Sequence, residues 1–341
     1  MKSFLLHTFL ITGICFAQLD NTESISKTGT TSAQFLKIGT GARAASMGNA
    51  FTAMSGGISS MYWNPAGMTS IRKLEAVFIN SDWIAGIKFN YTAVGLNLGQ
   101  AGVIGLSMTN LSSPEDVVRT VEKPNGTGEF FDANDLAINV SYAKRLTNKF
   151  SLGGNLKYIR QNIWHANANS IAADLGALFT TPFKNIRLGA SLSNYGPDMQ
   201  MTGRDQKFSV DPDPINEGNV EFVNAVYETD KFPLPLIFRV GLSGEIINTD
   251  FSRITFAIDA LHPNDNVEWV NFGLEFSSRE MFFLRGGFST LFSEDSEEGL
   301  TFGSGFNYRL AGSSTQIKLD YSYSEFGKLK DVQRLSIGIY F

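Results

Sequence analysis

The chain has 341 residues and a formal net charge of −5, and this acidic balance argues against a nucleic-acid-binding protein. Charged residues make up 18 % of it, against roughly 25 % in ordinary globular proteins, while glycine (33 residues) and phenylalanine (28 residues) are abundant and proline (10 residues) is scarce. This composition does not resemble that of a helical enzyme. After the N-terminus no run of about 18 apolar residues occurs, so the sequence excludes membrane-spanning helices from the rest of the chain.

The first residues have the features of a secretory signal peptide. A basic residue precedes an apolar stretch over 4–16, and Ala17 places a small residue just before the expected cleavage site. Ile14 stands where a lipoprotein signal needs a small residue, which argues against lipidation of Cys15. We expect 1–17 to be removed. Since the only cysteine leaves with it, the mature chain has no disulfide and no thiol chemistry.

The body of the chain shows period-2 alternation in segments of about ten residues. In 315–324, for example, Ile317 and Leu319 face one side and Lys318 faces the other. Fourteen such segments occur: 73–81, 84–98, 101–111, 135–146, 149–161, 169–181, 184–194, 236–246, 253–262, 267–277, 281–291, 299–310, 315–324 and 334–341. An even number of strands is typical of single-chain bacterial outer-membrane barrels. The sequence therefore predicts an all-β fold, a transmembrane antiparallel β-barrel of about 14 strands over 73–341.

The connections between the predicted strands alternate in length along the chain. Tight turns such as 99–100 and 147–148 alternate with long loops such as 112–134 and 195–233. Short periplasmic turns and longer extracellular loops are typical of outer-membrane barrels. If the last strand ends in the periplasm, every long loop lies outside the cell. We therefore predict a protein of the bacterial outer membrane, in contact with its lipid.

The inward phase of the predicted strands carries charges of both signs. These residues are Arg145, Lys157, Asp174, Arg239, Glu245, Arg253, Asp259, Glu275, Arg285, Arg309, Lys318 and Asp320. A mixture of signs favours a cross-linked, plugged lumen over an ion-selective pore. The alternative for any one of these residues is that it is merely solvated in the lumen and forms no ion pair.

The last strand ends in apolar residues at every second position. These are Leu335, Ile337, Ile339 and the terminal Phe341. This pattern resembles the C-terminal signal by which barrel-insertion machinery recognises outer-membrane proteins, and we predict that role for these residues.

Residues 18–72 do not alternate and precede the first predicted strand. The segment 18–34 is polar and the following stretch is dense in small residues, which allow backbone to pack closely. Asn64 begins a turn that Pro65 and a glycine complete. Arg43 is a candidate bidentate donor to a carboxylate of the lumen. We expect 18–72 to form a polar leader and an N-terminal plug inside the barrel.

Two motifs in this region resemble the N-terminal signature of the PorV/PorQ family of outer-membrane proteins. Their candidate plug residues are Gly41, Arg43, Met47 and Gly48, followed by Trp63, Asn64, Pro65, Ala66 and Gly67. That family is related to FadL-type fatty acid transporters, whose hatch also carries an Asn-Pro-Ala element. The resemblance implies a monomeric barrel with a plug. For PorV it implies a role in type IX secretion, beside the large translocon barrel and cargo with C-terminal signal domains.

The sequence contains no recognisable arrangement of catalytic residues. After removal of the signal peptide only His165 and His262 remain, in predicted outer loops of different hairpins, so neither a metal site nor a catalytic triad is expected. The stretch 39–41 lacks the strand-to-helix context of a nucleotide site. We predict no catalytic residue, no metal and no cofactor.

The long loop 195–233 is the candidate partner-binding surface. Its candidate contact residues are Phe208, Asp211, Asp213, Phe222 and Tyr227. Acidic residues outnumber basic ones in this loop, which favours a basic partner or divalent ions. Its apolar members indicate that it folds over the mouth of the barrel, while a merely solvated loop is the alternative.

Two function classes remain. The first is a non-catalytic secretion component that binds other proteins, and the second is a FadL-like channel for hydrophobic molecules such as long-chain fatty acids. A third strand kinked near Gly102 and Gly105, with an apolar tunnel behind Asn64 and Pro65, would favour transport. A closed wall with ordered outer loops would favour protein binding.

Overall fold

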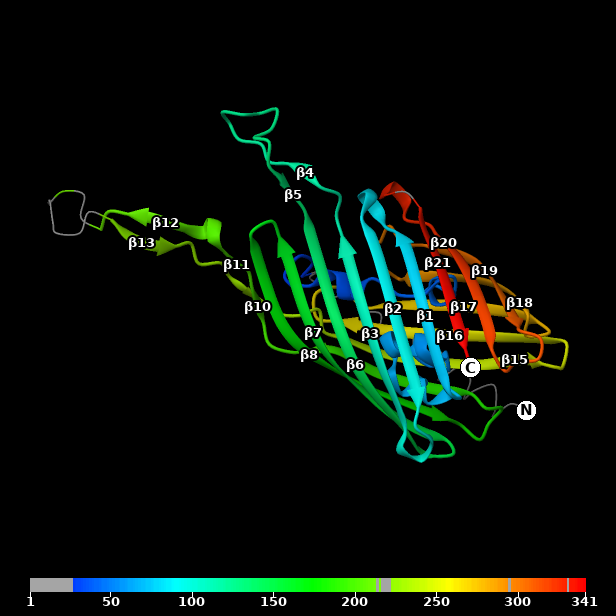
Figure 1. Cartoon of the computed structure of the whole chain (residues 1–341). Coiled ribbons are helices and arrows are strands. Elements are labelled where there is room, and N and C mark those ends of the chain that lie inside the picture. Colours follow the sequence, from blue (N-terminus) through cyan, green and yellow to red (C-terminus); the bar gives the residue numbers. More distant parts are fainter. Residues whose placement is uncertain (1–26, 213–214, 216–221, 294–295, 330) are drawn as a thin grey trace, which may run out of the picture.

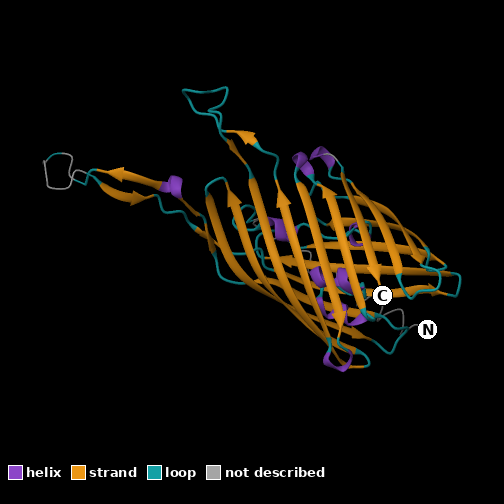
Figure 2. Ribbon diagram, viewed as in Figure 1, coloured by secondary structure: helices purple, strands orange, loops and turns teal. Residues whose placement is uncertain are grey.

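In the computed structural model, fourteen strands form an antiparallel barrel (Figures 1 and 2). The structure describes residues 27–212, 215, 222–293, 296–329 and 331–341, so the predicted signal peptide lies outside the described residues. The barrel strands are β1 (Leu74–Asp82), β2 (Lys88–Asn97), β3 (Val103–Ser112), β6 (Ala133–Thr147), β7 (Phe150–Ile163), β8 (Ala166–Thr180), β9 (Arg187–Tyr195), β15 (Ile237–Asn248), β16 (Ser252–Pro263), β17 (Trp269–Ser278), β18 (Phe282–Leu291), β19 (Leu300–Arg309), β20 (Gln316–Ser324) and β21 (Val332–Tyr340).

The barrel is closed by its first and last strands. β1 pairs with β21 from Glu75 opposite Tyr340 to Asp82 opposite Gln333. Each strand of the barrel pairs antiparallel with its neighbours, and the β8–β9 ladder carries one irregularity after Ala173. This closure pairs the edges of the first and last strands, which hydrocarbon requires because it offers no partner to a free backbone group.

The prediction of a 14-stranded antiparallel barrel is confirmed. The second strand was predicted to begin at residue 84, and this is wrong. Residues Ile84–Gly86 form a 3₁₀ turn, η4, in which Ala85 and Gly86 have positive φ, and the amide of Trp83 donates to the carbonyl of Ile87. β2 therefore begins at Lys88, because alternation of apolar residues cannot distinguish a tight turn from the strands that it joins.

The two faces of the wall differ in polarity as the alternation predicted. Large apolar side chains stand exposed on the outer face of every part of the barrel, among them Leu106, Leu156, Leu175, Leu284 and Phe302. So much exposed apolar surface is unusual for a protein surrounded by water and suits contact with lipid. On the inner face polar and charged side chains are buried.

In β21, Leu335, Ile337 and Ile339 lie on the outer face with the terminal Phe341, and their assembly role stays a prediction.

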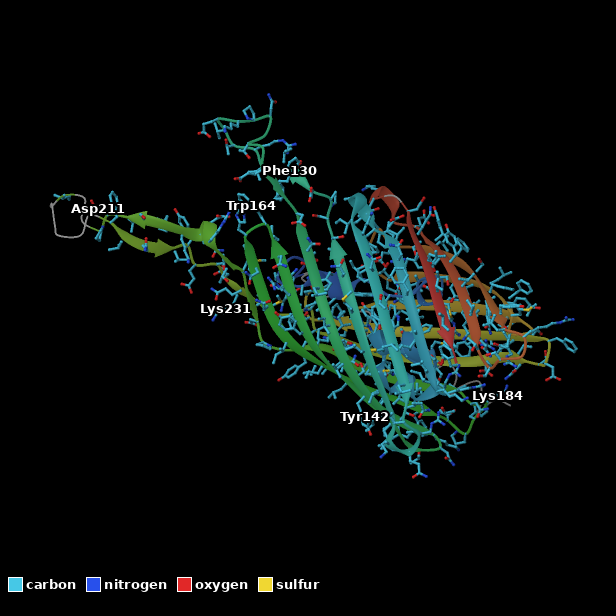
Figure 3. The ribbon with its side chains drawn as sticks, in the orientation of Figure 1. Phe130, Tyr142, Trp164, Lys184, Asp211 and Lys231 are labelled. Atoms are coloured by element: carbon cyan, nitrogen blue, oxygen red, sulfur yellow. The ribbon has the colours of Figure 1, made fainter. Side chains whose placement is uncertain are left out.

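The two ends of the barrel are different. Two ribbons project from one end, β4 (Asp116–Val117) with β5 (Phe130–Phe131), and β12 (Lys207–Val210) with β13 (Val223–Val226) (Figure 1). At the other end the connections are short turns, among them 148–149 and 279–281. Figure 3 shows Phe130 and Asp211 at the long-loop end and Lys184 at the short-turn end. Short turns face the periplasm in outer-membrane barrels, so the ribbons are extracellular.

Residues 31–71 pack against the inner face of the wall. They form η1 (Gln34–Lys37), α2 (Ala42–Ala45), η2 (Gly57–Ser59), α3 (Ser60–Trp63) and η3 (Pro65–Ser70). None of the helices in the described part of the chain is long and apolar enough to cross a membrane. Apolar side chains of this segment, among them Ile58, Met61 and Met68, form a core with inward residues of β1 to β3 and β6. We call residues 31–71 the inner segment.

Paired glycines on the inner face let the inner segment touch the wall. Four pairs face each other across neighbouring strands: Gly95–Gly105, Gly153–Gly176, Gly189–Gly241 and Gly273–Gly287. A Cβ at Gly287 would lie 2.2 Å from the amide nitrogen of Gly48, and a Cβ at Gly153 would lie 2.5 Å from the carbonyl carbon of Pro65. Backbone therefore rests directly on backbone, at a distance that a side chain would prevent.

We expect Gly287→Ala to destabilise the protein by about 1–3 kcal/mol, because the added methyl group overlaps the backbone of Gly48. Gly286→Ala is the matched control, since its Cβ points outward and would have no neighbour nearer than 3.9 Å. Thermal unfolding in detergent measures both variants. Equal melting temperatures for the two variants would show that the wall can accommodate a methyl group at Gly287, against this prediction.

Candidate functional site

A buried carboxylate joins the inner segment to the wall. Glu275 on β17 is 0 % exposed, and Arg43 of α2 donates to it from Nε (2.8 Å) and Nη2 (2.8 Å). Arg43 thus makes the bidentate contact with a carboxylate that the sequence predicted. Charge-assisted pairs of this kind are strong and directional. Two guanidinium groups of the wall also contact this carboxylate, Arg285 at 2.7 Å and Arg253 at 3.3 Å.

The network continues along the inner face. Arg285 also donates from Nη1 to Asp320 of β20 at 2.7 Å, and Arg253 pairs with Glu280 at 2.6 Å. The structure thus brings together residues that the sequence predicted only to share the inward phase. The charges of both signs cross-link β16, β17, β18 and β20, and the two carboxylates compensate the buried charge of Arg285.

We expect Arg43→Met to destabilise the protein by about 2–3 kcal/mol, because two hydrogen bonds to a buried carboxylate are lost while the apolar stem is kept. Arg43→Lys keeps the charge but lacks the planar guanidinium group, so its stability should lie between that of the parent protein and that of Arg43→Met. Thermal unfolding reports stability, and conductance in planar bilayers reports whether the inner segment has loosened. Unchanged melting and conductance in Arg43→Met would contradict this role.

The Asn-Pro-Ala turn is fixed by the side chain of its asparagine. The Oδ1 of Asn64 accepts from the amide of Ala66 (3.1 Å), while Nδ2 donates to the carbonyls of Thr52 (2.8 Å) and Ala177 (2.9 Å). Ala177 belongs to β8, so one side chain ties the turn, the preceding segment and the wall together. Asn64 is fully buried, and with Pro65 it lies against the glycine pair of β7 and β8.

The other predicted plug residues occupy close contacts. Met47 and Gly48 lie against the glycine pair of β17 and β18, and Gly41 precedes α2 with φ of 92°. Trp63 donates from Nε1 to the carbonyl of Thr40 at 3.1 Å and packs edge-on to its neighbour Tyr62. These residues hold the inner segment in one place. Their functional role stays a prediction.

A second anchor was not foreseen from the sequence. Asp265, between β16 and β17 at the extracellular end, accepts hydrogen bonds from Thr31 (2.7 Å), Gln34 (2.7 Å) and Lys37 (3.0 Å). Burial alone would raise the pKa of this carboxyl group, but the hydrogen bonds from Gln34, Thr31 and Lys37 together hold the pKa below its usual value. A donor-rich stretch opposite a loop aspartate gives no periodic signal in sequence.

Because the pKa of Asp265 is lowered in the folded protein, its contribution to stability is present above the usual pKa of an aspartate and is lost as the pH falls through the lowered value. The protection of the amide hydrogens of 31–37 against exchange, relative to the intrinsic rate at each pH, should therefore fall at acidic pH. Asp265→Asn should show low protection already at neutral pH, and its protection should depend less on acidity. Hydrogen exchange by mass spectrometry tests this, and equal protection in both proteins at neutral pH would refute it.

The predicted partner-binding loop forms the β12–β13 ribbon. The expectation that it folds over the mouth is wrong, since the ribbon projects away from the barrel (Figure 1). Its aromatic side chains are exposed, by 36 % at Phe208, 60 % at Phe222 and 66 % at Tyr227. Cross-strand pairing within the ribbon and stacking of Phe208 on Tyr227, with ring centroids 4.4 Å apart, order it. Asp211 precedes its tip, and Asp213 lies outside the described residues.

The base of this ribbon is attached to the neighbouring hairpin. His165, in the turn between β7 and β8, lies with Nδ1 2.6 Å from Oδ2 of Asp205 and with Nε2 2.7 Å from Nη2 of Arg204. Trp164 stacks on the same imidazole at 4.1 Å. β11 (Thr202–Gly203) also pairs with the outer end of β8. One of the two predicted outer-loop histidines thus serves to position the ribbon.

A family model described as type IX secretion system protein PorV matches residues 20–223. The chain belongs to the PorV family. The matched part of this family member contains the inner segment, the barrel strands β1 to β9 and β12, and it ends at Val223, the first residue of β13. The family resemblance inferred from the two N-terminal motifs is therefore confirmed, and with the barrel it indicates the bacterial outer membrane. A search among curated protein sequences found no match.

Solved structures share the fold. A Pseudomonas aeruginosa FadL homologue matches with a TM-score of 0.54 at 11 % identity, covering 88 % of this chain and 98 % of its own. The Pseudomonas putida toluene transporter TodX matches with a TM-score of 0.53 at 11 % identity, covering 88 % and 97 %. The CymD monoaromatic hydrocarbon channel matches with a TM-score of 0.53 at 14 % identity, covering 89 % and 96 %. This PorV family member thus has a FadL-like barrel.

Proposed function

We propose that this PorV family member is a non-catalytic component of type IX secretion that binds the translocon and secreted cargo at its extracellular end. The observation that carries the proposal is the β12–β13 ribbon, a tethered element that presents exposed aromatic side chains away from the barrel. An exposed cluster of large apolar groups on an ordered element is typical of a protein interaction site. The candidate contact residues are those predicted from the sequence, with Phe208, Phe222 and Tyr227 as the aromatic members.

A hydrophobic transporter of FadL type is the second candidate, because the similar solved structures include proteins titled as hydrocarbon channels and a toluene transporter. Two observations support protein binding instead. β3 pairs with β2 and with β6 without any register shift, so its two ladders are unbroken near Gly105. A Cβ at Gly176 would lie 2.2 Å from Asn64 Oδ1, so the Asn-Pro-Ala turn rests directly on the wall there.

Deletion of 205–229 should leave the barrel assembled and abolish capture of partners, because the ribbon makes few contacts with the barrel beyond its base. The double substitution Phe208→Ser with Tyr227→Ser is the finer test, since it removes the stacked aromatic pair and keeps the chain length. Phe183→Ser is the matched control, because Phe183 is an aromatic residue of similar exposure in a turn at the periplasmic end.

The measurement is mild detergent extraction from native membranes followed by mass spectrometry of the co-purifying molecules. Recovery of a very large barrel or of signal-domain cargo with the parent protein and the control, and its loss in the ribbon variants, is the expected result. Undiminished capture by the ribbon variants would remove the ribbon from the proposal. Bound fatty acid without any protein partner would favour the transporter.

A further inference from the structure

A cavity of about 990 Å³ lies at the periplasmic end of the barrel. Its rim includes the start of β1, the turn residues 279–281 and 313–314, and the last residues of the chain. Its inner boundary includes Arg43, Arg253 and Arg285, the three arginines that contact Glu275. We call this cavity the periplasmic vestibule.

The periplasmic vestibule is basic in a protein that is acidic as a whole. Eight arginine and lysine residues line it against three aspartate and glutamate residues, while the whole chain has a net charge of −5. A concave surface with one prevailing sign concentrates the electrostatic field and raises the local concentration of ions of the opposite sign. The excess of positive charge therefore favours an anionic ligand in this cavity.

Five of these basic residues form no close ion pair within the described part of the chain, although Glu75 attracts Lys318 and Arg72 from a longer distance. Arg72, Lys73, Arg279, Arg309 and Lys318 make neither an ion pair within 4.0 Å nor a side-chain hydrogen bond to a described residue. The ammonium group of Lys318 lies 4.1 Å from the centre of the Tyr340 ring, partly withdrawn from water. Among the acidic lining residues, Glu75 already accepts the amide of Ile58 at 2.9 Å.

We propose that the periplasmic vestibule binds an acidic peptide segment of a periplasmic protein. The unpaired cations come from the junction before β1, the β17–β18 turn, the end of β19 and the middle of β20. Charges distributed over four places suit a chain with several carboxylates better than one compact phosphate group. Phe283, Phe306 and Met281 line the same cavity and offer apolar contacts to the rest of such a segment.

This site stands apart from the proposed extracellular function. The periplasmic vestibule and the β12–β13 ribbon lie at opposite ends of the barrel, and their lining residues belong to different elements. A variant of the vestibule that still captures secretion partners would leave the proposed function intact, and a variant of the ribbon should not change binding in the vestibule.

The test uses the full-length protein in lipid nanodiscs and a fluorescein-labelled oligoglutamate peptide, with oligoglutamine of equal length as the neutral probe. The triple variant Arg72→Gln, Lys73→Gln and Arg309→Gln removes three exposed unpaired cations. The matched control Lys123→Gln, Lys207→Gln and Lys231→Gln removes the same charge at the extracellular end. We expect salt-sensitive binding of oligoglutamate that is weakened about tenfold in the vestibule variant only.

Three results would overturn the proposal. Equal binding of oligoglutamate and oligoglutamine would show that carboxylates are not recognised. Equal weakening in both triple variants would show that binding follows the net charge of the protein and not a local site. Binding of inorganic pyrophosphate or of phosphatidylglycerol, lost in the vestibule variant while oligoglutamate does not bind, would assign the cavity to a phosphate ligand.

Discussion

Direct contact between the backbone of the inner segment and the backbone of the wall is the interaction on which the rest of the barrel interior depends. The cross-strand glycine pairs make this contact possible, because a methyl group at Gly153 or Gly287 would overlap the backbone of Pro65 or Gly48. Once the backbones are in contact, the side chains on either side of the glycines have fixed partners. Arg43 reaches Glu275, and Asn64 reaches the carbonyl of Ala177. Such close packing leaves the inner segment a single position.

The sequence predicted the barrel well because a transmembrane strand carries a strong period-2 signal over about ten residues. The lipid-facing residues and the inward charges both follow from that phase. The pairing of Glu275 with three arginines could not be predicted from this alternation. The alternation tells which face of the wall a residue lies on, but not its position along the barrel axis or its neighbours. The anchor at Asp265 was missed for a related reason, since it joins two irregular segments, 31–37 and 264–268, that show no periodicity.

The outer ribbon shows another limit of the sequence. Apolar residues in the loop 195–233 predicted a cover over the mouth, because apolar groups usually find a buried surface. In the structure they pair across a ribbon that projects from the barrel and stays exposed. Composition alone cannot distinguish a loop that packs on its own protein from one whose apolar groups are directed to another molecule.

The Arg43–Glu275 pair joins residues 232 positions apart in the chain, and the same short helix, α2, also contacts β19 to β21. α2 precedes every strand of the barrel, yet its partners on β17 and β19 to β21 are among the last strands to be made. Closing β1 against β21 seals the wall around it. Contacts between such distant parts of a chain form late and slowly in folding. The segment must therefore be enclosed while the barrel is still open, so the order of assembly is part of what the sequence encodes.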